Sequence, residues 1–169
     1  MESLDTLLAE FRVLLATYHG TLSNYVGDAF FAVWEPDSVP NAPRLALDFV
    51  VAALARLDDV SSTLALRSVD GGAIRMGWGL ARGQAAMSSL TGALLGVVGD
   101  AANLAFRLSS LAARQGRGDV LVADTLYDDV ATHYPFDARE WLEIKGYAEP
   151  VAAHALRLRD QPIGTLRRG

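Results

Sequence analysis

Apolar residues recur at intervals of three and four positions in several stretches of the chain, which is the spacing of one face of an α-helix. The clearest stretch runs through Leu4, Leu7, Phe11 and Leu15, and Gly20 follows it as a stop signal. The same spacing predicts four helices in all, over residues 3–19, 43–57, 101–113 and 124–133.

Shorter apolar runs bounded by glycine, asparagine or aspartate have the length and composition of β-strands. Gly27 and Asp28 separate two such runs, and Lys145 and Gly146 separate two others, so each pair is expected to form a hairpin. Residues 73–88 are expected to form another. The predicted strands cover residues 21–26, 29–34, 73–80, 83–88, 94–98, 119–123, 141–144 and 151–157.

This alternation of helices and antiparallel hairpins predicts an α+β fold, in which helices pack on a mainly antiparallel sheet. We expect one domain over residues 1–158 and a flexible tail over residues 159–169. The residues expected in the core are Leu8, Phe11, Leu15, Phe30, Ala32, Leu104 and Leu108.

Composition narrows the class of protein. The net charge of −5 argues against a general nucleic-acid-binding or membrane-surface protein. The chain has no cysteine, which excludes disulfides and thiolate metal sites. No apolar run approaches the roughly 18 residues needed to span a bilayer, and the acidic start has no signal-peptide pattern. We therefore expect a cytoplasmic location and no membrane segment.

Candidate chemistry begins at the first hairpin. Asp28 directly follows Gly27 at the predicted turn, where a carboxylate projects outward from a rigid scaffold. Mg²⁺ prefers such oxygen ligands. The alternative is a turn aspartate that accepts a hydrogen bond from its own backbone.

Two further segments carry polar residues at suggestive positions. Asn103 and Arg107 lie four residues apart on a predicted helix, which Asp100 is expected to cap, and therefore share one face. An amide and a guanidinium placed in this way can hold a ribose oxygen and a phosphate, or can form an ordinary polar face. Lys145, at a hairpin bend, can reach a phosphate or remain solvated.

Taken together, in their order and separation, these segments resemble the class III adenylate and guanylate cyclases. The motifs are Asn-x-x-Gly-Asp-x-Phe-x-Ala-x-Trp at 24–34, Gly-Asp-x-x-Asn-x-Ala-x-Arg-Leu at 99–108, and Ile-Lys-Gly at 144–146. The family's middle strand-turn-strand corresponds to residues 75–83, in a variant with glycine near the bend. The resemblance covers nearly the whole chain and implies a ferredoxin-like cyclase homology domain, and the composition suggests a bacterial member.

The resemblance implies a function in signal transduction. Such an enzyme converts a nucleoside triphosphate, here ATP, to a 3′,5′-cyclic nucleotide and pyrophosphate, with Mg²⁺ or Mn²⁺ as cofactor. Asp28 matches a metal aspartate, Asn103 the ribose-orienting asparagine, Arg107 the transition-state arginine and Lys145 the phosphate-binding lysine. The resemblance also implies a head-to-tail homodimer, or a pair with a related cyclase chain. One partner supplies the metal residues, and the other supplies the asparagine and arginine.

The sequence departs from the family pattern in three ways. The family opens with a strand that carries the first metal aspartate, whereas this sequence begins at the next helix, so we expect an N-terminally incomplete domain that makes little cyclic nucleotide. Asn24 stands where adenylate cyclases carry a lysine that reads the base, and Gly96 stands where its partner aspartate belongs. These two substrate-binding positions fit neither the adenine nor the guanine scheme, which leaves the base open.

Two other functions remain as alternatives. A catalytically degenerate cyclase-like module would dimerise and hold nucleotide without chemistry, and the missing aspartate favours it for the chain taken alone. An unrelated ferredoxin-like binding domain is the third. The presence of Asp28, Asn103, Arg107 and Lys145 favours the enzyme.

Overall fold

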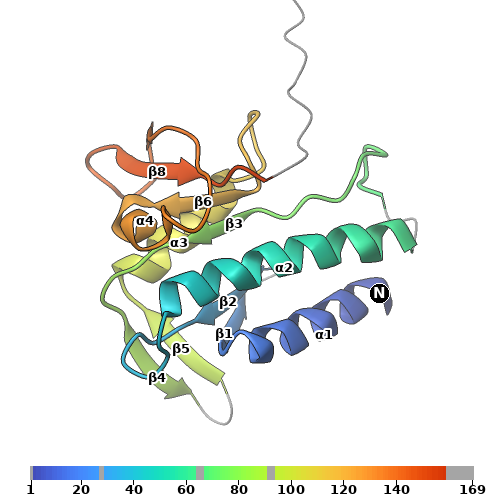
Figure 1. The fold of residues 1–169 in the computed structure, drawn as a ribbon, viewed down its shortest axis with the longest axis horizontal. Coiled ribbons are helices and arrows are strands. Elements are labelled where there is room, and N and C mark those ends of the chain that lie inside the picture. The colour runs from blue at the N-terminus through green and yellow to red at the C-terminus, as the bar shows by residue number, and fades with distance from the viewer. Residues whose placement is uncertain (1, 27–28, 64–66, 91–93, 159–169) are drawn as a thin grey trace, which may run out of the picture.

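The structure is a computed structural model that describes residues 2–26, 29–63, 67–90 and 94–158 (Figure 1). Within these residues it contains four helices and eight strands. The helices are α1 (Glu2–Thr17), α2 (Ala42–Thr63), α3 (Asp100–Leu111) and α4 (Asp124–Val130). The strands are β1 (Thr21–Val26), β2 (Ala29–Val33), β3 (Trp78–Leu80), β4 (Ala86–Leu90), β5 (Leu94–Val98), β6 (Val120–Ala123), β7 (Glu140–Leu142) and β8 (Val151–Ala155).

The described strands form three hydrogen-bonded groups. β1 pairs with β2 and β4 pairs with β5, both antiparallel, and the remaining strands form a sheet in the order β3-β6-β8-β7. In that sheet β3 runs parallel to β6, whereas β8 is antiparallel to both of its neighbours. The predicted α+β class with mainly antiparallel pairing is therefore confirmed.

The predicted hairpin of 73–80 with 83–88 is wrong. β3 pairs with β6 instead, with Trp78 opposite Val120, and β4 pairs with β5, with Ser88 opposite Gly96. The physical reason lies in β6, in which all four residues are buried. A strand that is apolar on both faces is most stable in the interior of a sheet. It therefore takes β3 and β8 as neighbours on its two edges.

Two clusters of buried side chains lie on the two faces of β6. Val120 and Val122 join the first cluster, to which α1, α2 and α4 contribute. Leu121 and Ala123 join the second, to which α3, β7 and β8 contribute. Alternate residues of a strand face opposite sides, so β6 separates a layer containing α1 and α2, which run side by side, from α3 (Figure 1).

Most of the predicted core is confirmed. Phe11, Leu15, Leu104 and Leu108 are at most 7% exposed. Three other predicted core residues are only half-buried, although Phe30 and Ala32 pack against the first cluster. The third is Leu8, whose neighbour Leu7 is buried instead, because Leu7, Phe11 and Leu15 form a row with a spacing of four. Helix α2 also continues six residues beyond the predicted end, to Thr63.

Polar contacts connect α2 with its neighbours. The Arg56 guanidinium donates to Glu10 on α1 over 3.0 Å, and this bond lowers the pKa of the Glu10 carboxyl. On the other side of α2, the Tyr134 hydroxyl donates a hydrogen bond to Asp48. Burial, together with this bond to a carboxylate, raises the pKa of Tyr134 well above its ordinary value.

Candidate active site

Helix α3 carries the two residues predicted to act on substrate. Leu104 and Leu108 face the second core cluster. Asn103 is exposed and Arg107 is half-buried, one helical turn apart as predicted. Within the part of the chain that the structure describes, neither side chain has a hydrogen-bond or ion-pair partner. Both groups are therefore available to a ligand.

The start of α3 differs from the prediction. The N-cap residue is Gly99, with φ of 150°, and no side chain caps the helix there. Asp100 is the first helical residue instead of the cap, so its carboxylate acts on the positive end of the helix dipole. Gly99 is required because a Cβ at this position would lie 2.9 Å from the carbonyl oxygen of Gln84. The close approach of the 84–85 segment thus explains why glycine occupies the cap.

Lys145 lies in a turn that packs against α3. The turn is closed by a hydrogen bond from the Tyr147 amide to the Ile144 carbonyl, over 3.1 Å, and Gly146 has φ of 95°. Ile144 is buried in the same cluster as Leu104, which seats the turn beside the helix. Lys145 itself is exposed, and none of the described residues forms an ion pair with it. Lys145 therefore lies in a turn beside α3, the helix that carries Asn103 and Arg107.

The first hairpin is described on both sides of its turn. β1 and β2 pair from Thr21 opposite Val33 to Val26 opposite Ala29, which confirms the predicted strands. Asp28 lies outside the described residues, and so does the side chain of Asn24. The register shifts between Leu22 and Tyr25, where β1 has one residue more than β2 opposite it. The backbone of position 24 is part of this irregularity.

Gly96 lies in β5, opposite Ser88 on β4. It is half-buried, and β5 also lies against β1, the strand that contains Asn24. The two predicted base-reading positions are therefore on neighbouring strands. Their role in reading the base stays a prediction.

A metal site is not assembled by the described residues. Among them, no three His, Asp or Glu side chains gather closely enough to hold an ion. Asp28, the predicted ligand, lies outside these residues. The prediction that Asp28 binds Mg²⁺ or Mn²⁺ therefore stays a prediction.

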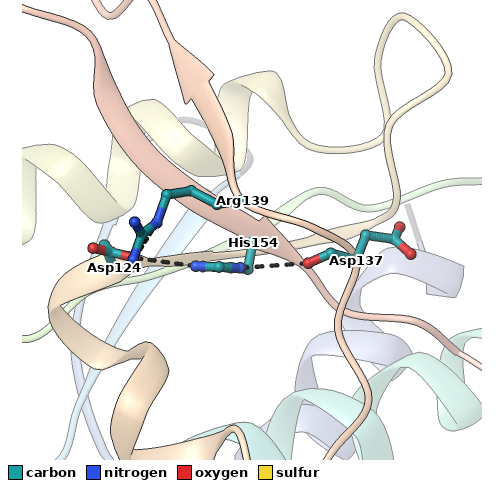
Figure 2. Close-up of polar contacts among 4 residues, drawn as sticks. All are labelled: Asp124, Asp137, Arg139 and His154. Atoms are coloured by element: carbon teal, nitrogen blue, oxygen red, sulfur yellow. Dashed lines mark hydrogen bonds and ion pairs between the residues drawn. The ribbon is translucent and has the colours of Figure 1, made fainter.

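Sequence reasoning missed a polar network around His154, a buried residue of β8 that is 4% exposed (Figure 2). Its Nε2 donates to Asp124 Oδ1 over 3.0 Å, and the Arg139 guanidinium binds the same oxygen at 3.1 Å. The ring also stacks on Tyr127 at 3.6 Å between centroids. Because both ring nitrogens face protein acceptors, the second being the carbonyl of Asp137, this histidine ties α4 to β8 and offers no nitrogen to a ligand.

No protein-family model matches the sequence, and no curated protein matches it. Solved structures do resemble the fold. The guanylyl cyclase Cya2 matches with a TM-score of 0.78 at 19% identity, over 96% of this chain and 82% of that one. The adenylyl cyclase CyaB from P. aeruginosa matches with a TM-score of 0.73 at 16% identity, over 96% and 84%.

A third solved structure is the guanylate cyclase domain of RhGC from Catenaria anguillulae in complex with GTP. It matches with a TM-score of 0.67 at 17% identity, over 94% of this chain and 83% of that one. Among the described residues, no helix is long and apolar enough to cross a membrane.

The three structural matches show that the chain has the fold of the class III adenylyl and guanylyl cyclase catalytic domains.

Proposed function

We propose that this chain is a nucleotidyl cyclase domain that converts a nucleoside triphosphate, in the first place ATP, to a 3′,5′-cyclic nucleotide and pyrophosphate. The observation that carries the proposal is the surface of α3. Asn103 and Arg107 stand one turn apart there, at the positions of the cyclase motif, without partners among the described residues. The turn with Lys145 packs beside them on a fold shared with cyclases.

The reaction makes one bond and breaks another. The ribose 3′-oxygen forms a bond to the α-phosphorus, the bond from that phosphorus to the oxygen bridging the β-phosphorus breaks, and the 3′-hydroxyl proton passes to solvent. Negative charge grows on the phosphoryl oxygens during this step. Arg107 is always charged, and its half-buried position keeps part of the solvent from screening it. It is the proposed transition-state residue.

The other two residues bind the substrate in this proposal. The Asn103 amide supplies both a donor and an acceptor to the ribose. Lys145, which is exposed and before a glycine with positive φ, places an ammonium group near the triphosphate. A divalent ion would lower the pKa of the 3′-hydroxyl and neutralise the triphosphate. We propose that Asp28, at the position of a metal aspartate in the cyclase motif, helps to hold this ion.

We propose that the active form is a head-to-tail homodimer. The exposed Asn103 and Lys145 leave this surface open to a partner. In such a pair, α3 of one protomer meets the β1–β2 hairpin of the other, and two sites form. Sedimentation velocity at micromolar concentrations, with and without nucleotide, tests this assembly, and a monomer under all conditions would contradict it.

The function is tested by incubating the chain with ATP, GTP, CTP or UTP and Mn²⁺, and by detecting cyclic products with mass spectrometry. Arg107→Ala is expected to lower kcat more than it raises KM, because the contact strengthens in the transition state. Arg114→Ala is the matched control, since Arg114 is exposed just beyond the end of α3. Nucleotide binding without any product would establish the degenerate module instead.

A further inference from the structure

Two phenylalanines connect strand β2 to helix α3. The rings of Phe31 and Phe106 stack with their centroids 6.0 Å apart and their planes 18° apart. Both are half-buried. The preceding residue, Phe30, points to the opposite face of β2, where it contacts Phe49 and Trp78. Thus β2 has an aromatic contact on each of its faces.

Backbone pairing does not hold the β1–β2 hairpin to the main sheet in the described part of the chain. There, β2 pairs only with β1, and β3 pairs only with β6. Side-chain packing must therefore set the position of the hairpin relative to β3. On one face of β2, Phe30 contacts Trp78 of β3, with centroids 5.6 Å apart, and on the other face Phe31 contacts Phe106 of α3.

Helix α3 packs against β3 and β6, contacts β5, and also meets the β1–β2 hairpin at β2. Against β3 it packs at backbone contact, because Gly77 and Gly79 have no side chain to hold it away. Against β2 it is held by the phenylalanine stack. The ring stack is consequently a direct side-chain contact between the hairpin and α3, beside the packing of β1 against β5, the strand that leads into α3.

We propose that Phe31 and Phe106 are positioning residues, whose stack fixes the orientation of α3, and with it Arg107, relative to the β1–β2 hairpin. The inference rests on the function proposed above. Arg107 directly follows Phe106 in the sequence. In a two-fold homodimer each protomer gives its hairpin to one site and its α3 to the other. The angle between the hairpin and α3 within one protomer therefore decides whether the two sites of the dimer can form at the same time.

The first test does not depend on catalysis. The chain has no cysteine, so Glu35→Cys after β2 and Ser110→Cys on α3 give two unique spin-label sites, both exposed. Pulsed electron paramagnetic resonance on the labelled chain is expected to give one narrow distance distribution within a protomer. Adding Phe106→Leu should broaden or shift it, and Phe106→Tyr, which keeps the ring, should leave it narrow.

A matched control separates this effect from general loosening. Phe136 is also a half-buried ring, in contact with Tyr127 at 5.3 Å, but it lies away from α3. Phe136→Leu is expected to leave the distribution unchanged. An unchanged distribution in Phe106→Leu, or equal broadening in Phe136→Leu, would overturn the inference.

The second test is kinetic. Phe31→Leu and Phe106→Leu should each lower kcat by about 10- to 100-fold, as displacements near 1 Å do, with a smaller change in KM. The double variant should be no slower than either single variant, because the stack can be lost only once. Phe136→Leu should lower the melting temperature while keeping kcat.

The two proposals fail in different ways. If the unmodified chain forms no cyclic product from any of the four nucleotides, the proposed function fails, and the spin-label distances still decide the positioning inference. If the chain forms product but both leucine variants keep its kcat, the inference fails and the proposed function stands.

Discussion

Gly79 is the residue at which β3 and α3 approach most closely, and Gly79→Ala tests how tightly α3 is held. A Cβ at this position would lie 2.1 Å from the carbonyl oxygen of Ala105 and 2.5 Å from the amide nitrogen of Ser109. Both are backbone atoms of α3 and cannot turn aside as a side chain can. To restore an ordinary contact of 3.4 Å from 2.1 Å, the helix must move by about 1.3 Å.

The expected cost follows from this displacement. Overpacking a well-packed contact costs about 1–3 kcal/mol. For a chain of this size each kcal/mol corresponds to about 2–4 °C, so the melting temperature should fall by about 2–12 °C. Because Arg107 moves with the helix, kcat should fall by about tenfold or more. Circular dichroism melts and the nucleotide assay measure the two effects.

The matched control for this substitution is Gly118→Ala. A Cβ at Gly118 would have its nearest contact at 3.5 Å, from the carbonyl oxygen of Leu156, which is ordinary van der Waals distance. It should shift the melting temperature by no more than about 1 °C, within the range of surface substitutions. If Gly79→Ala had the same melting temperature as Gly118→Ala, α3 would not pack on β3 in the way described. The reasoning about the position of Arg107 would then be wrong.

Three other predictions concern base choice, metal and pH. Asn24→Lys combined with Gly96→Asp should shift the preference among nucleotides towards ATP, because these side chains supply the donor and acceptor that the adenine edge requires; unchanged ratios of kcat/KM would refute the assignment. Asp28→Ala should weaken a Mn²⁺ affinity that is already low, since one carboxylate leaves most ligand positions to water; calorimetry that found tight binding in both chains would contradict this. Tyr134→Phe should cost about 1–3 kcal/mol, because it leaves the Asp48 carboxylate without its donor. Because the pKa of Tyr134 is raised in the folded state, its contribution to the free energy of unfolding is complete below about pH 10 and is lost as the pH rises through the folded-state pKa. In unfolding experiments, only the unmodified chain should show this loss of stability at alkaline pH.

The helices and the local part of the site were predictable from the sequence. Helix periodicity depends on neighbours three and four residues apart, so it placed α1 and α3 within two residues of their observed ends. The same spacing placed Asn103 and Arg107 on one face, one turn apart. The first hairpin was predicted for a similar reason, since its strands are joined by only two residues.

Strand pairing at long range was not predictable in the same way. The prediction joined residues 73–80 to 83–88 because they are adjacent in sequence, whereas β3 pairs with β6, about forty residues further on. The burial of all four β6 residues selects this partner, and burial is a property of the whole core. The contact of His154 with Asp124 likewise joins residues thirty positions apart, and histidine spacing along the chain carries no signal for it.

The chemistry and the geometry of the candidate site thus have different origins in the sequence. The groups proposed to touch substrate lie in short motifs, and a pattern of ten residues marks Asn103 and Arg107 as candidates. Their placement depends on contacts between distant segments, above all Gly79 with Ala105 and Phe31 with Phe106. A substitution at one of these contacts keeps every side chain that would touch substrate and changes only where those side chains lie. Such variants should therefore retain nucleotide binding and lose rate, because turnover depends more steeply on position than binding does.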